Sequence, residues 1–203
     1  MNVIDLTHLF TNSMPVFPGD DLPKLQDSFD AENVIVHYHL ETGMHIGTHM
    51  DGPLHMVPGA KKLSDIKPEN FIAPGVIIDA RGKSEIGVEL LAGKIINPGD
   101  CIIIYTGFAS KFNDPEFYTN YPDLTEDFAR KLVDLKVKFV GMDTCSPDKA
   151  PYKVHRILLK AEILIIESLT NLDQLLGLKS FEIIALPAKF EAEAAPVRVI
   201  ARY

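Results

Sequence analysis

The chain has 203 residues, 46% of them hydrophobic, which allows one sizeable core and is short for two domains. The net charge of −8, without any run of lysines or arginines, argues against a nucleic-acid partner. The N-terminal residues do not form a basic region followed by an apolar signal segment, and no apolar run is long enough for a membrane span. We therefore expect one domain over residues 1–203, in a cytoplasmic protein with no membrane partner.

The N-terminal part predicts a short strand, a turn-rich loop and a second strand. Residues 2–8 form the first strand, and residues 11–21 form a loop rich in asparagine, proline, glycine and aspartate. Phe17 in this loop has two interpretations: an ordinary apolar plug, or an aromatic wall of a substrate site. Residues 34–40 are β-branched and half-alternating, which predicts the second strand.

Two histidines, His37 and His39, share one face of that second strand, because strand side chains repeat every second residue. Their spacing raises the alternative of a cupin metal site. The cupin pattern has its glutamate several residues later, whereas Glu41 follows His39 after one intervening residue. A surface role for both histidines is the favoured interpretation.

Residues 45–55 are the densest group of metal-binding side chains in the sequence, with three histidines and one aspartate: His45, His49, Asp51 and His55. The glycines and proline between them would weaken a regular helix or strand, so the side chains converge through a folded-back loop. Imidazole and carboxylate together suit Zn²⁺, Mn²⁺ or Fe²⁺. The alternative is a histidine-rich surface loop, but the density and the glycine placement favour a metal site.

Beyond residue 60, strands and helices are mixed without the strict alternation of a doubly wound sheet. The expected strands cover residues 75–80, 101–106, 139–143, 163–166, 181–186 and 197–201. The expected helices and helical turns cover residues 61–70, 88–92, 123–136, 154–162 and 172–176. The fold class is therefore α/β, a single domain with a mixed central sheet.

Three local features in this part bear on the interpretation. Residues 123–126 resemble a capping box in which Asp123 is the cap of the following helix. Cys101 begins a buried strand, which predicts inert packing. Cys145 is a conceivable nucleophile, but it has no histidine nearby in the sequence and would lie beside a credible metal centre, so this role is disfavoured.

Several common catalytic patterns are absent from the sequence. It contains no G-x-S-x-G serine elbow, no G-x-x-x-x-G-K-[ST] or G-x-G-x-x-G nucleotide cradle, and no H-E-x-x-H zinc motif. A metal with a water bound to it remains as the source of chemistry.

The pattern H-x-G-T-H-x-D-x-P-x-H resembles the signature of the metal-dependent cyclase family, which includes bacterial kynurenine formamidases and isatin hydrolases. All seven fixed positions are present: His45, Gly47, Thr48, His49, Asp51, Pro53 and His55. Flanking segments match in the same order, namely residues 14–20, 141–144, 185–187 and 195–198. Two departures bear on the substrate: Cys145 stands where many formamidases have proline, and residues 191–196 form an altered loop.

The resemblance implies a swivelling β/β/α fold, a homo-oligomer (dimer or tetramer), and one or two divalent metals, Zn²⁺ or Mn²⁺, per subunit. It implies that His45, His49 and Asp51 hold the first metal. Asp51 would bridge to a second metal held by His155 and Glu167, which occupy the positions of the family's distal ligands. Without the resemblance, a structural ion pair remains the less favoured alternative for His155 and Glu167.

The implied reaction is hydrolysis of a small-molecule amide, an aryl formamide such as N-formylkynurenine or a cyclic amide. His55 would act as general base and then as general acid toward the amine leaving group. One alternative is a binding or regulatory protein that kept the metal loop without turnover; another is a hydrolase of an unrelated small amide or lactone. His55 favours the enzyme, because metal binding alone needs no base beside the ligands.

Overall fold

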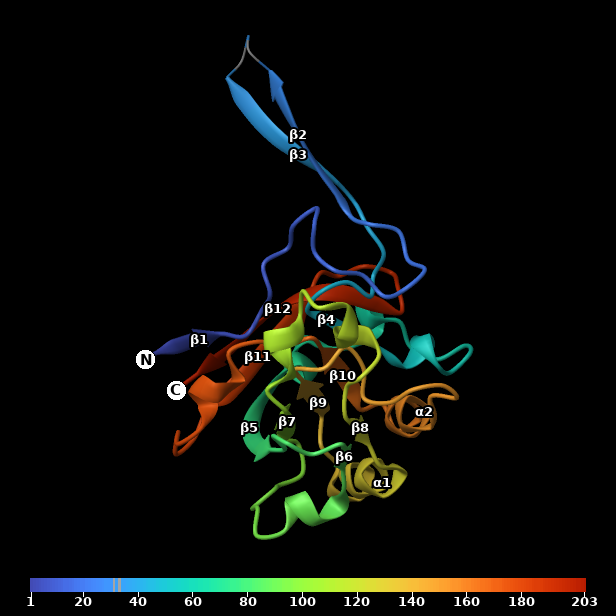
Figure 1. Cartoon of the computed structure of the whole chain (residues 1–203), viewed down its shortest axis with the longest axis vertical. Helices are drawn as coiled ribbons and strands as arrows, with labels where there is room; N and C mark the ends of the chain where they lie inside the picture. Colours follow the sequence, from blue (N-terminus) through green and yellow to red (C-terminus); the bar gives the residue numbers. More distant parts are fainter. Residues whose placement is uncertain (31, 33) are drawn as a thin grey trace.

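The computed structural model describes residues 1–30, 32 and 34–203. An eight-stranded mixed sheet dominates it (Figure 1), in the order β1 (Val3–Asp5), β12 (Ala194–Arg202), β11 (Glu182–Pro187), β5 (Ile72–Asp79), β7 (Cys101–Tyr105), β9 (Phe139–Met142), β10 (Leu164–Glu167) and β4 (His49–Asp51). Because β4 also pairs with β12, seven of these strands close on themselves and β1 extends the sheet from β12. The predicted α/β fold with a mixed central sheet is confirmed.

The four central strands β5, β7, β9 and β10 run parallel, and β7, β9 and β10 are buried on both faces. On β7, Cys101 and Ile103 join the apolar cluster inside the closed sheet. Ile102 and Ile104 point the other way, into a second cluster between the sheet and the helices. A strand buried on both faces reads as a continuous apolar run, which is why the sequence predicted it well.

Two helices, α1 (Glu126–Leu135) and α2 (Lys153–Lys160), cover the outer face of the parallel strands (Figure 1). Thr125, not Asp123, caps α1, because the Thr125 hydroxyl accepts from the Phe128 amide at 3.1 Å. The prediction of Asp123 as the cap is therefore wrong. Asp123 lies on β8 (Asp123–Leu124), which pairs with β6 (Glu85–Ile86), and its carboxylate accepts from Lys149 at 2.7 Å.

Short 3₁₀ turns complete the described chain: Pro53–His55, Leu63–Asp65, Pro68–Phe71, Val88–Leu91, Phe108–Lys111, Pro115–Tyr118 and Leu172–Leu175. The helix expected over residues 61–70 is two such turns, since Pro68 cannot donate the backbone hydrogen bond that would continue the first. No helix in the described part of the chain is long and apolar enough to cross a membrane.

A hairpin of β2 (Lys24–Asp30) and β3 (Ile35–Glu41) forms a separate two-stranded sheet that projects from the body (Figure 1). The second strand expected in this region is present as β3, one residue later at each end. β2 was not predicted, because its polar composition gives little strand signal. His37 and His39 are exposed on β3.

Candidate metal and active site

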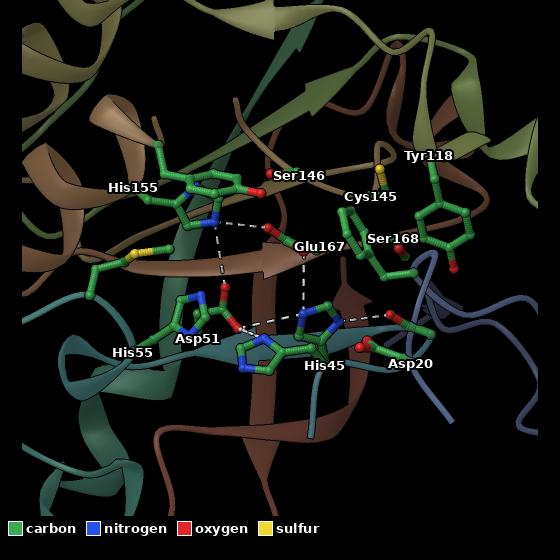
Figure 2. A pocket seen from close by; sticks show the side chains of 15 residues that line it. Asp20, His45, Asp51, His55, Tyr118, Cys145, Ser146, His155, Glu167 and Ser168 are labelled. Atoms are coloured by element: carbon green, nitrogen blue, oxygen red, sulfur yellow. Dashed lines mark hydrogen bonds and ion pairs between the residues drawn. The ribbon is translucent and has the colours of Figure 1, made fainter. Parts of the chain in front are cut away.

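The centre of the candidate site lies on two neighbouring strands. β4 carries His49 and Asp51, and in the antiparallel register with β10 Glu167 lies opposite His49. Alternation along β4 places His49 and Asp51 on one face, together with Glu167, while Met50 points into the core. His155 on the first turns of α2 approaches the same face, so residues more than a hundred positions apart meet there (Figure 2).

Gly47 allows the chain to turn between His45 and His49. Its backbone has a φ of +52°, and the methyl group of Met14 occupies the space that a β-carbon would need. The Gly47 carbonyl oxygen accepts a hydrogen bond from Nδ1 of His49 at 2.9 Å. This bond directs Nε2 of His49 toward the carboxylates, 3.3 Å from Glu167 and 3.5 Å from Asp51.

The rings of His155 and His45 are also oriented by an acceptor at the nitrogen that points away from the centre. In both cases this acceptor is a carboxylate. Nδ1 of His155 donates to Asp148 at 2.5 Å, and its Nε2 lies 3.3 Å from Glu167. Nε2 of His45 lies 3.3 Å from Glu193, and its Nδ1 lies 2.9 Å from Asp51. Each of the three imidazoles therefore points one nitrogen inward and has an acceptor behind the other nitrogen. Such outer partners fix the tautomer and orientation of a metal-binding histidine.

Sequence reasoning missed Asp148 and Glu193. Glu193 falls in the segment 191–196 that was noted as an altered loop, without a role in the site. Asp148 precedes α2 by five residues and belongs to no recognisable motif. Only the fold brings these carboxylates behind His45 and His155.

The inward-facing atoms form a set suited to a divalent cation. In the described structure, His49 Nε2, both carboxylate oxygens of Asp51 and Glu167 Oε1 are buried without a hydrogen-bond partner. Leaving such atoms unpaired is costly, and a cation would satisfy all of them. Two groups have ligand atoms within 4.8 Å of one another, and both contain Asp51: His49, Asp51 and Glu167; and His45, Asp51 and His55. This nitrogen and oxygen donor set fits Zn²⁺ or Mn²⁺.

The protonation of these groups reflects the excess of negative charge at the centre. Burial opposes the charging of His49, but the neighbouring carboxylates of Glu167 and Asp51 outweigh it and raise the pKa of His49 to about 9. Burial likewise opposes the charging of His155, and its contacts with Asp148 and Glu167 raise its pKa to about 10. The carboxylates thus favour positive charge between them, which a metal cation would supply in place of protons.

His55 differs from the three oriented histidines. It ends the 3₁₀ turn Pro53–His55 and is only partly buried, with its ring 4.3 Å from that of His45 and 5.9 Å from that of His155. Burial lowers its pKa below the usual value, so the ring is neutral at pH 7. A neutral imidazole at the edge of the centre is able to accept a proton there.

A cavity of about 280 Å³ opens onto this centre. Its lining residues are Phe17, Asp20, His45, Gly47, His49, Asp51, His55, Met56, Tyr118, Cys145, Ser146, Tyr152, His155, Glu167 and Ser168 (Figure 2). Phe17 is 41% exposed and meets Tyr118 edge to face, with 5.8 Å between the ring centroids. Phe17 therefore lines the cavity instead of packing in the core, and its contact with a substrate stays a prediction.

Neither cysteine is placed to act as a nucleophile. Cys145 lines the cavity, but its thiol donates to the Phe117 carbonyl at 3.2 Å, and burial raises its pKa well above the usual value. Cys101 is fully buried on β7, in agreement with the predicted packing role. A thiol with a raised pKa carries too little thiolate for attack.

Known proteins resemble the chain in sequence and in fold. The cyclase family model matches residues 4–149. The chain is 30% identical to a kynurenine formamidase of Bacillus mycoides, with 98% of this chain and 96% of that protein covered. Among solved structures, isatin hydrolase A from Ralstonia solanacearum superposes with a TM-score of 0.88 at 26% identity, covering 98% and 91% of the two chains. A predicted metal-dependent hydrolase from Bacillus stearothermophilus superposes with a TM-score of 0.83 at 27% identity, covering 98% and 97%. The chain belongs to the cyclase family, with kynurenine formamidases and isatin hydrolases among its relatives.

Proposed function

We propose that the protein is a divalent-metal-dependent hydrolase that cleaves the C–N bond of an aryl formamide such as N-formylkynurenine, or of a cyclic amide. The main support is the convergence of unpaired buried atoms of His49, Asp51 and Glu167 at the base of an open cavity. The names of the relatives, kynurenine formamidase and isatin hydrolase, support the amide class of substrate.

Five side chains would supply the metal ligands: His45, His49, Asp51, His155 and Glu167. If two ions bind, Asp51 would be a ligand of both. A divalent cation bound there would lower the pKa of water and polarise the substrate carbonyl. His55 would take the proton of the attacking water at one of its ring nitrogens and return it to the leaving nitrogen. Phe17 and Tyr118 would hold the aryl group by ring contacts at the cavity wall.

We also propose the domain organisation, metal content, assembly and location of the enzyme. Residues 1–203 would form one catalytic domain, with one or two Zn²⁺ or Mn²⁺ ions per subunit. The substrate would be a small molecule, the chain would assemble as a homo-oligomer, and the enzyme would act in the cytoplasm. Two carboxylates behind the imidazoles, Asp148 and Glu193, support the metal part of the proposal, because they are placed to orient His155 and His45.

The test is an assay of protein purified without chelator on N-formylkynurenine and on isatin, combined with metal analysis. Hydrolysis should disappear with a chelator and return on adding Zn²⁺ or Mn²⁺. Bound metal without hydrolysis of either compound would favour a regulatory homologue or a hydrolase of a different amide or lactone. Full activity in metal-free protein would refute the proposal.

A further inference from the structure

The cavity at the candidate metal centre is lined by carboxylates and imidazoles but by no fixed positive charge. Within the described chain its lining includes no lysine and no arginine, and it includes the carboxylates of Asp20, Asp51 and Glu167. Asp51 and Glu167 are buried and have unpaired oxygens at the proposed metal position. Asp20 is exposed and belongs to neither candidate ligand group, so its charge is left for a molecule that enters the cavity.

The Asp20 carboxylate forms no ion pair with any lysine or arginine in the described part of the chain. Lys24, the nearest lysine along the sequence, pairs with Glu41 at 2.9 Å instead. The charge of Asp20 is felt at the cavity wall: burial is the main cause of the raised pKa of the Tyr118 hydroxyl, and the charge of Asp20 adds to it. Asp20 is therefore an unpaired acid close to the aromatic pair of Phe17 and Tyr118.

A tight turn fixes Asp20 relative to that aromatic pair. The Asp20 amide donates to the Phe17 carbonyl at 3.0 Å. Pro18 and Gly19 occupy the two central positions, and Gly19 has a φ of +104°, in agreement with the positive φ at the third position of a type II turn. The turn therefore presents Phe17 and Asp20 to the cavity as one unit.

The position of Asp20 suits a group of the substrate that is remote from the reacting bond. Figure 2 shows Asp20 and His55, the proposed acid–base group, at opposite ends of the site. A substrate with its amide at the metal and its aryl group against Phe17 and Tyr118 would extend its next group toward Asp20. A carboxylate there attracts an alkylammonium group and repels a carboxylate, and the net charge of −8 acts on an approaching substrate in the same sense.

We propose, on the basis of the proposed amide hydrolysis, that Asp20 determines specificity: it favours aryl amides that carry an alkylammonium group beyond the aryl ring over neutral or carboxylate-bearing ones. The ammonium lies away from the reacting bond, so its ion pair with Asp20 stabilises the bound substrate and the transition state equally. Asp20 should therefore lower KM for such substrates and leave kcat unchanged.

Three ortho-formamidophenyl ketones test this role, with alkyl arms of equal length that end in an ammonium, a methyl or a carboxylate group. In wild type loaded with Zn²⁺, kcat/KM should be highest for the ammonium ketone and lowest for the carboxylate ketone. Asp20→Asn should reduce the ratio of kcat/KM between the ammonium and methyl ketones by about two- to fivefold, the loss expected for an exposed ion pair, through a higher KM. Asp20→Lys should reverse the order of the ammonium and carboxylate ketones.

Asp21→Asn is the matched control, because Asp21 is the adjacent exposed carboxylate and does not line the cavity. It should leave the ratio unchanged. Equal kcat/KM for the three ketones in wild type would refute the role of Asp20 and uphold the aryl formamide activity. An unchanged ratio in Asp20→Asn, an equal change in Asp21→Asn, or a lower kcat with unchanged KM for all three ketones in Asp20→Asn would also refute that role. If none of the ketones is hydrolysed, the aryl formamide activity and the role of Asp20 both fail.

Discussion

Asp148 provides the sharpest test of the candidate metal centre, because it acts on that centre without touching it. One of its carboxylate oxygens accepts from His155 Nδ1 at 2.5 Å, and the other accepts from the Val154 amide at 2.7 Å. In Asp148→Asn the single amide oxygen can serve only one of these donors. If it serves Val154, the amide group faces His155 Nδ1, which must then accept, and the ring proton moves to Nε2.

A proton on Nε2 would point at the proposed metal position and block coordination by His155. Loss of an outer partner of this kind typically costs ~10–100-fold in metal affinity, which corresponds to about 1.4–2.8 kcal/mol. We therefore expect the Kd of Asp148→Asn for Zn²⁺, measured by competition with a chromophoric chelator, to rise by about that factor. The fold should persist, as circular dichroism can check, because the bond to the start of α2 survives.

Asp123→Asn is the matched control. Asp123 is also a carboxylate near the start of a helix, but it pairs with Lys149 at the surface. Its substitution should leave the Zn²⁺ affinity unchanged. Wild-type affinity in Asp148→Asn, or an equal loss of affinity in Asp123→Asn, would refute the role of Asp148 as the residue that orients His155.

Four further outcomes follow from the same geometry. His55→Ala should keep its bound metal while kcat falls by ~10²–10⁴-fold, and loss of metal in a metal analysis would instead make His55 a ligand. Asp51→Ala should lose most bound metal, since both candidate ligand groups share Asp51, and a full metal complement would contradict that. Glu167→Gln should lower the metal stoichiometry more than the melting temperature; the reverse order would indicate a structural ion pair with His155. Burial lowers the pKa of His8, whose ring stacks on Phe112, to about 4 from an unfolded value of 6.5, so the unfolded state binds the extra proton. The free energy of unfolding that depends on neutral His8 should therefore be lost as pH falls from about 6.5 to 4. Urea unfolding at pH 7.5 and pH 5 should show a smaller loss of this free energy in His8→Phe than in wild type. Equal losses in the two proteins would exclude His8 as the source.

The parts of the fold that were predictable are those whose signal is local. The run Cys101–Tyr105 is apolar on both faces because it lies between two apolar clusters, and it was predicted within one residue. No strand was predicted over Lys24–Asp30, because this mostly polar segment contains no β-branched residue. Asp123 matched a capping pattern, but pairing of β8 with β6 engaged its backbone and left the cap to Thr125.

The sequence by itself determined where the candidate metal ligands gather, because His45, His49, Asp51 and His55 fall within eleven consecutive residues and therefore cannot lie far apart. The family resemblance named His155 and Glu167 as further candidates, but only the tertiary structure shows how they meet the motif and which carboxylates stand behind the imidazoles. Closure of the sheet inserts β4 between β10 and β12, and this brings Glu167 opposite His49 and Glu193 behind His45. Asp148 reaches His155 because the loop before α2 folds back over the first turn of that helix. The contacts of His49 with Glu167 and of His45 with Glu193 depend on strand register and on sheet closure over more than a hundred residues, and no local spacing encodes them.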